Sequence, residues 1–150
     1  MTEPSTTRGE PVRQFSVFMP NRVGAMLGIV KMVNESLAEV LGMSLQDSVD
    51  GTVARMVVSD ADAVETLFIE KGIPHATSEI VVVELGDASF FGDCLTTLLE
   101  AETNVHFCYS LMSRPNGRPT LAFYLDDLEF GRSILSANGF KVLYQNDLSR

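Results

Sequence analysis

The stretch His75–Asp87, HATSEIVVVELGD, lies at the middle of the chain and decides how the rest is organised. Its centre, Ile80–Leu85, is an apolar run rich in β-branched residues, with strand length and no helical spacing. Such a run predicts a strand that is buried on both faces or nearly so. Because the same order of elements precedes and follows it, we expect this strand to close one structural unit and to open another.

Each half of the chain reads as strand, helix, two strands, helix and strand. In the first half the predicted elements are Gln14–Met19, Gly24–Leu37, Glu39–Gln46, Thr52–Val58, Asp60–Lys71 and a closing strand that begins near Pro74. In the second half they are Ile80–Leu85, Ser89–Glu100, Val105–Met112, Thr120–Leu125, Leu128–Ala137 and Phe140–Gln145. The pattern predicts an internal duplication of a βαββαβ unit with a period of roughly 65 residues. An antiparallel sheet with helices on one face is an α+β, ferredoxin-like fold.

Apolar spacing within the predicted helices indicates which side chains face the sheet. The inward residues are expected to be Met26, Ile29, Val30, Val33 and Leu37 in the first helix, and Val64, Leu67 and Phe68 in the second. In the second half they are Phe91, Cys94, Leu95 and Leu98, then Phe130, Ile134 and Leu135. Gly28 lies inside a helix, where glycine is unfavourable, so we expect close packing there. The acidic residues at helix starts, Asp60 or Ser59 and Asp126 or Asp127, are expected to be caps.

Composition and charge exclude several classes of partner. The formal net charge of −9 disfavours nucleic acids and anionic membrane surfaces, which attract basic proteins. Two isolated cysteines, Cys94 and Cys108, predict reduced thiols in a cytoplasmic protein. Met1–Val12 is expected to be a flexible tail, and the first thirteen residues contain no apolar segment that would predict a signal peptide. No motif calls for a cofactor.

The turn between the first strand and helix, Asn21-Arg22-Val23-Gly24-Ala25-Met26, resembles the Asp/Asn-x-Pro-Gly-x-Leu turn of ACT domains. Val82-Val83-Glu84-Leu85 and Asn104–Tyr109 resemble the second unit of tandem ACT-domain proteins, and Gly139–Leu143 fits the same pattern. The resemblance covers about Gln14 to Asp147 and implies ACT-like domains at residues 13–79 and 80–150, after the tail at 1–12. Val23 and Met26 depart from the family's proline and leucine, and Ser89 stands where the second unit would have its glycine.

ACT domains bind amino acids and regulate metabolism, so the resemblance implies a ligand site between a strand–helix turn and the second strand of another unit. Helix N-termini attract carboxylates, and a glycine backbone can approach an ammonium group closely. The expected first wall is Asn21, Arg22, Val23, Gly24, Ala25 and Met26. The opposite wall is expected from Met43, Ser44, Leu45 and Gln46 or from Cys108, Tyr109 and Ser110, with Ser89 and Phe90 as further candidates.

These features favour a regulatory protein that senses a free amino acid, without catalysis, and that forms a homodimer and acts on a metabolic enzyme. No nucleophile elbow, phosphate loop or dinucleotide fingerprint is present. A second interpretation is an interaction module or regulatory subunit that has lost ligand binding, since the second turn lacks its glycine. A third is a metal sensor built on His106 and Cys108, which would need a further ligand such as His75 or Cys94.

Overall fold

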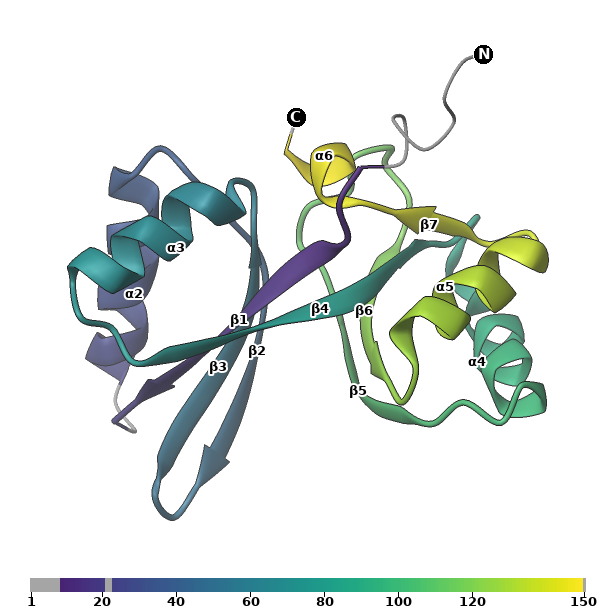
Figure 1. Cartoon of the computed structure of the whole chain (residues 1–150), viewed down its shortest axis with the longest axis horizontal. Helices are drawn as coiled ribbons and strands as arrows, with labels where there is room; N and C mark the ends of the chain where they lie inside the picture. The colour runs from purple at the N-terminus through teal and green to yellow at the C-terminus, as the bar shows by residue number, and fades with distance from the viewer. Residues whose placement is uncertain (1–8, 21–22, 150) are drawn as a thin grey trace. The chain divides into compact units, whose positions relative to one another are not determined.

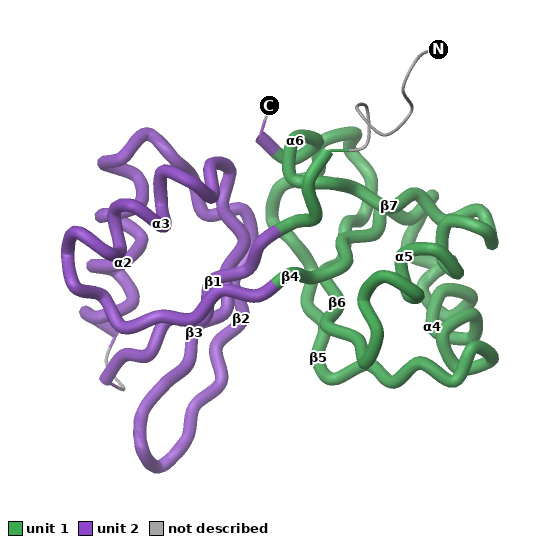
Figure 2. The backbone as a smooth tube through the Cα atoms, in the orientation of Figure 1, with its two compact units in different colours: residues 1–12, 79–148, 150 green, residues 13–78, 149 purple. Residues whose placement is uncertain are grey.

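The computed structural model of the protein describes residues 9–20 and 23–149. The chain divides into two compact units, coloured separately in Figure 2. Residues 13–78 and 149 form the first, here called the N-terminal unit, and residues 1–12, 79–148 and 150 are assigned to the second, here called the C-terminal unit. Residues 1–8 of the expected tail lie outside the described residues. Val12, which we expected in the tail, is fully buried as the first residue of a strand.

The N-terminal unit has the elements predicted for the first repeat. They are β1 (Val12–Met19), α2 (Val23–Glu35), β2 (Val40–Ser48), β3 (Gly51–Val58), α3 (Ala61–Glu70) and the beginning of β4 (His75–Glu84) (Figure 1). The strands follow the hydrogen-bonded order β2-β3-β1-β4. The two-residue turn Val49-Asp50 joins β2 to β3, and Ser48 pairs with Gly51 across it.

The C-terminal unit repeats this arrangement. It contains the rest of β4, the 3₁₀ turn η1 (Ala88–Phe90), α4 (Phe91–Glu100), β5 (Val105–Ser110), β6 (Thr120–Leu125), α5 (Leu128–Ala137), β7 (Lys141–Leu143) and α6 (Gln145–Leu148). Its strand order is β5-β6-β4-β7, with antiparallel pairs throughout. Counted within each repeat, both orders are 2-3-1-4, which is the ferredoxin-like order. The predicted fold is confirmed, and β4 closes one repeat and opens the other.

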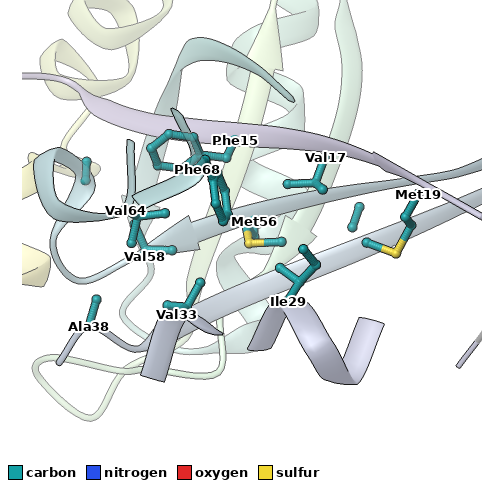
Figure 3. Packing of buried hydrophobic residues seen from close by; sticks show 12 residues of the cluster. Phe15, Val17, Met19, Ile29, Val33, Ala38, Met56, Val58, Val64 and Phe68 are labelled. Carbon is teal, nitrogen blue, oxygen red and sulfur yellow. The ribbon is translucent and has the colours of Figure 1, made fainter. Parts of the chain in front are cut away.

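The core of the N-terminal unit lies between one face of its sheet and its two helices (Figure 3). Alternate strand residues supply one side of this core, since successive side chains in a strand point to opposite faces. The helices supply the other side through Ile29, Val33, Val64 and Phe68, all buried. Phe15 and Phe68 meet edge to face, with ring centroids 5.6 Å apart. This is the packing that the 3.6-residue spacing of α2 and α3 predicts.

The core of the C-terminal unit is built in the same way. Strands β4 and β6 contribute Val81, Val83, Leu85, Phe123 and Leu125, and the helices contribute Cys94, Leu98 and Leu135. All of these residues are at most 2% exposed. Both helices therefore cover the same face of this sheet, as the resemblance implies. Among the described residues, no helix is long and apolar enough to cross a membrane.

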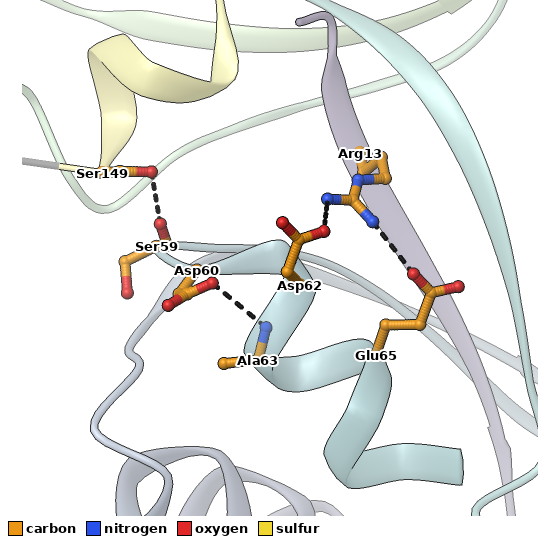
Figure 4. A network of polar contacts seen from close by, with 7 residues as sticks. All are labelled: Arg13, Ser59, Asp60, Asp62, Ala63, Glu65 and Ser149. Atoms are coloured by element: carbon orange, nitrogen blue, oxygen red, sulfur yellow. Dashed lines mark hydrogen bonds and ion pairs between the residues drawn. The ribbon is translucent and has the colours of Figure 1, made fainter.

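Polar contacts hold the start of α3 in place (Figure 4). The Asp60 carboxylate accepts a hydrogen bond from the Ala63 N–H at 3.1 Å, which makes Asp60 the N-cap. Arg13 on β1 forms ion pairs with Asp62 and, at 3.0 Å, with Glu65. In the second repeat Asp127 caps α5 in the same way through the Phe130 N–H. Asp60 and Asp127 are thus N-caps of their helices, as their positions predict.

Two expectations for the first helix are wrong. The helix ends at Glu35, and Leu37 is 95% exposed with a left-handed φ of 66°. After the helix the backbone tightens, because the N–H groups of Ser36 and Leu37 donate to the carbonyls three residues earlier, each at 3.1 Å, and the left-handed backbone of Leu37 ends the helical path. A Cβ atom built on Gly28 would meet nothing within 4 Å, so this glycine makes no close contact with the described residues.

The second repeat departs from prediction at its surface and at its end. Phe91, Leu95 and Phe130 are 37%, 38% and 44% exposed, because each lies at the border of its helix's apolar face. The predicted helix from Ser89 begins with a 3₁₀ turn, and the strand from Val105 ends at Ser110. The last strand stops at Leu143, where the chain turns into α6; the Tyr144 N–H donates to the Asp147 carboxylate within this turn. The short helix was not predicted.

Candidate functional site

A cavity of about 450 Å³ lies in the C-terminal unit where β4 leads into α4. We call it the turn cavity. Three segments far apart in sequence surround it: the end of β4 with the following turn and helix, the β5–β6 connection, and the α5–β7 connection. Its lining residues are Glu84, Gly86, Phe90, Asp93, Thr97, Arg118, Asn138, Gly139, Phe140 and Lys141. The volume falls within the usual range for small-molecule sites.

The turn that borders this cavity is built by Asp87. Its carboxylate accepts hydrogen bonds from the Ser89 hydroxyl and, at 2.7 Å, from the Ser89 N–H. The hydrogen bond from the Ser89 hydroxyl, and next the one from the Ser89 N–H, hold the pKa of Asp87 below its ordinary value. A Cβ atom on Gly86 would lie 3.3 Å from the Phe90 ring. The glycine therefore lets the aromatic ring lie close against the turn, at the side of the cavity.

Charges of both signs line the turn cavity. Glu84 is only 6% exposed, and its carboxylate accepts a hydrogen bond from the Asn116 side chain at 2.7 Å. Asp93 lies in the first turn of α4, and Arg118 and Lys141 supply positive charge. Phe90 and Phe140 add apolar surface. The cavity thus offers partners for a carboxylate, for an ammonium group and for an apolar side chain.

Sheet register explains why these charges meet. Glu84 pairs with Lys141 across β4 and β7, and with Thr120 across β4 and β6. Arg118 stands two residues before Thr120, at the same end of the sheet. Sequence reasoning missed Glu84, Asp93, Arg118 and Lys141 because it looked for the family turn alone. The ferredoxin-like strand order, applied to Glu84, would have pointed to its two cationic neighbours.

Of the residues predicted in the second repeat, only Phe90 lines the turn cavity. Ser89 lies beside it, but its hydroxyl is bound to Asp87. Cys108, Tyr109 and Ser110 lie on β5, away from the cavity lining. Tyr109 stacks on Phe107, with ring centroids 6.4 Å apart.

The residues predicted in the first repeat that the structure describes lie in α2 and β2 of the N-terminal unit and do not line the turn cavity. Asn21 and Arg22 lie outside the described residues. Val23 and Gly24 begin α2 and are exposed, whereas Ala25, Met26 and Met43 pack against the core of this unit. On β2, Ser44 is half-buried and Leu45 is 50% exposed, and the Gln46 side chain accepts a hydrogen bond from Arg55 at 2.8 Å. The structure therefore brings Met26 and Met43 to one core, as packing residues.

His106, which the metal-sensor interpretation uses as a ligand, has another partner. The His106 ring contacts the Asp126 carboxylate, which also accepts a hydrogen bond from the Asn104 side chain at 2.9 Å. The hydrogen bond with His106 is the largest cause that lowers the pKa of Asp126. Within residues 9–20 and 23–149, no three His, Cys, Asp or Glu side chains are grouped so that they could hold a metal ion.

Both thiols are less acidic than an ordinary cysteine. Burial, and next the neighbouring Cys108, raise the pKa of Cys94 from 9.0 to about 11, and burial raises the pKa of Cys108 as well. At pH 8 only about 1 in 1,000 Cys94 side chains would be the reactive thiolate.

We expect iodoacetamide to label Cys94 about 100-fold more slowly than a free thiol, with the rate rising up to pH 11. Peptide mass spectrometry would measure this, and equal labelling of Cys94 and exposed Cys108 would contradict it.

A family model described as an ACT domain pair matches residues 10–150. No protein of curated function matches the sequence. The protein BT0572 from Bacteroides thetaiotaomicron has a similar structure, with a TM-score of 0.84 over 95% of this chain and 99% of that chain, at 14% identity.

Two further solved structures share the fold. The aspartokinase α and β subunits give a TM-score of 0.54 at 17% identity, over 85% of this chain and 91% of that chain. The regulatory subunit of aspartate kinase from Thermus thermophilus, in its ligand-free form, gives 0.53 at 10% identity, over 85% and 89%. At these identities the likeness concerns the fold.

Proposed function

This chain belongs to the family of ACT domain pairs, and from that premise we propose that it is a regulatory protein that senses a free amino acid. We assign its two ACT-like domains to residues 13–79 and 80–150. The observation that carries the proposal is the turn cavity, where a strand–helix turn of the family fold is lined by both charge signs. Regulation would pass to a partner such as a metabolic enzyme, with the chain acting as a homodimer.

The proposed ligand position follows from the charges of a free amino acid. Its α-carboxylate would be bound by Arg118 and Lys141, and its α-ammonium group by Glu84 and Asp93. Hydrogen bonds to charged groups contribute about 1.5–3 kcal/mol each. Phe90 and Phe140 would contact the ligand's side chain, which favours an apolar or aromatic one. Ligands that lack either charge would leave one pair of protein groups without a partner.

The turn residues expected in the first repeat would belong to a second ligand position. Val23, Gly24, Ala25 and Met26, with Asn21 and Arg22, would contribute a second ligand position if another copy of the chain supplied the opposite wall. The open space around Gly24 supports this, because no described residue fills the position of its missing Cβ.

A second candidate function is an interaction module that has lost ligand binding. The observation that favours it is Ser89, which stands at the family glycine position and whose hydroxyl is already bonded to Asp87. If the chain is such an interaction module, the turn cavity would bind no ligand. The two functions predict opposite outcomes in one experiment.

That experiment is thermal unfolding of the full chain with each of the twenty amino acids at millimolar concentration. A ligand present at about 100 times its dissociation constant stabilises by about 2.7 kcal/mol, which corresponds to roughly 5–10 °C here. We expect such a shift for one or a few apolar or aromatic amino acids, and a much smaller shift for their amides and decarboxylated amines. No shift for any amino acid would overturn the sensor proposal and leave the interaction module.

A further inference from the structure

The β5–β6 connection, residues 111–119, reaches the turn cavity through Arg118. The two residues before Arg118, Asn116 and Gly117, lie in an exposed turn in which the Gly117 N–H donates to the Arg114 carbonyl at 2.9 Å. Surface connections are usually more mobile than the strands they join. A cationic side chain on such a connection therefore needs contacts outside it to keep a fixed position beside a ligand site.

Two hydrogen bonds tie this connection to the end of β4, one on each side of Arg118 in the sequence. The Asn116 side-chain amide donates to Oε1 of Glu84 at 2.7 Å. The Leu85 N–H donates to the Pro119 carbonyl at 2.9 Å. Glu84 and Leu85 are adjacent in the chain, and they are 6% and 2% exposed. Arg118 is thus attached on both sides to one buried segment.

The Glu84 carboxylate has room for a second partner. Among the described residues, the one hydrogen bond of this side chain is the bond from Asn116 to Oε1. In the described structure the only buried side-chain nitrogen or oxygen atom without a partner belongs to Arg132, so Oε2 of Glu84 is at least partly accessible. Because Glu84 lines the turn cavity, Oε2 is an acceptor for an ammonium group bound there. Asn116 thus holds one carboxylate oxygen and leaves the other for a ligand.

We propose that Asn116 is a positioning residue that fixes the spacing between Glu84 and Arg118 and thereby makes the turn cavity selective for α-amino acids. This inference rests on the proposed amino-acid function of the cavity. An α-amino acid carries its ammonium group on the carbon next to the carboxylate, and a β-amino acid carries it one carbon further away. Binding groups that are held in place before the ligand arrives discriminate between such spacings. Without the Asn116 bond the connection is free to move, and Arg118 adapts to either ligand.

The test is isothermal titration of the full chain with two probes. One is the standard amino acid that gives the largest thermal shift of the twenty, and the other is its β-homologue, which has the same side chain and one more methylene between the two charges. We expect the wild type to bind the α-amino acid at least about 10-fold more tightly, because a misplaced hydrogen bond to a charged group loses about that factor. In Asn116→Ala this preference should fall to about 3-fold or less.

Two further variants make the test specific to the anchor. Asn116→Gln keeps the amide donor on a side chain one methylene longer, so it satisfies Glu84 but displaces the connection, and it should also lower the preference. Asn104→Ala is the matched control, because the Asn104 amide likewise donates to a carboxylate, that of Asp126 at 2.9 Å, and neither residue lines the turn cavity. It should keep the wild-type preference. Among the described non-glycine residues a positive φ occurs at Leu37 and Glu102, so neither substitution at Asn116 replaces a left-handed residue.

The ratio of the two affinities separates a positioning role from a structural one. If both affinities fell by the same factor in Asn116→Ala, the ratio would be unchanged, Asn116 would be structural only, and the inference would be overturned. Equal binding of the two probes by the wild type, or an equal loss of preference in Asn104→Ala, would overturn it as well. These outcomes leave the amino-acid function standing. Binding of none of the twenty amino acids by the wild type would overturn that function, and this inference with it.

Discussion

Replacing Phe68 by alanine is expected to destabilise the N-terminal unit by about 3–5 kcal/mol. Phe68 is fully buried on α3, where its ring meets Phe15 edge to face and lies 5.4 Å from the His75 ring. The substitution removes this apolar surface from the core and leaves a cavity that β1, β4 and α3 border. Aromatic pairs add about 0.5–1.5 kcal/mol beyond the buried area. The lost apolar burial and the lost aromatic pair both lower the free energy of unfolding.

Urea unfolding of the full chain would measure this effect. The matched control is Ile69→Ala, the next residue of α3, which is 66% exposed and should change the unfolding free energy by no more than about 0.5 kcal/mol. If Phe68→Ala cost less than about 1 kcal/mol, the packing between α3 and the sheet would not be as described. A comparable loss in both variants would indicate that the whole helix, and not its inner face, sets the stability.

Replacing Arg118 by methionine is expected to weaken the binding of the sensed amino acid by about 10- to 150-fold. Methionine keeps much of the aliphatic length but removes the charge that would bind the ligand's α-carboxylate. Hydrogen bonds to charged groups are worth about 1.5–3 kcal/mol, which gives this range. Arg118 is exposed, so the unfolding temperature without ligand should stay close to that of the wild type.

Isothermal titration with the amino acid that gives the largest thermal shift would measure the dissociation constant. Arg114→Met is the matched control, because Arg114 lies in the same β5–β6 connection but does not line the turn cavity. An unchanged affinity in Arg118→Met would remove the turn cavity from the proposal. An equal loss in both variants would indicate a general effect of net charge, since each substitution makes an acidic protein more acidic.

Local patterns predicted most of the fold because each pattern has a local physical cause. The run Ile80–Leu85 is buried throughout, as its unbroken apolar and β-branched sequence predicts. Asp60 and Asp127 were expected among the caps because a carboxylate before a helix satisfies free N–H groups. The prediction failed at Leu37, where a left-handed backbone that apolar spacing does not reveal ends the helix. It also failed at Gln145, where a single turn of helix has too few residues to show a period.

The sequence by itself determined the duplication, the order of strands and helices, and the family resemblance that the match over residues 10–150 confirmed. Only the tertiary structure decided which side chains share a cavity. Glu84, Arg118 and Lys141 are up to 57 positions apart in the chain (141 − 84 = 57), and they meet because β4 pairs with both β6 and β7. Short-range periodicity reports which face a residue occupies, whereas the meeting of distant residues depends on sheet register, which no local pattern contains.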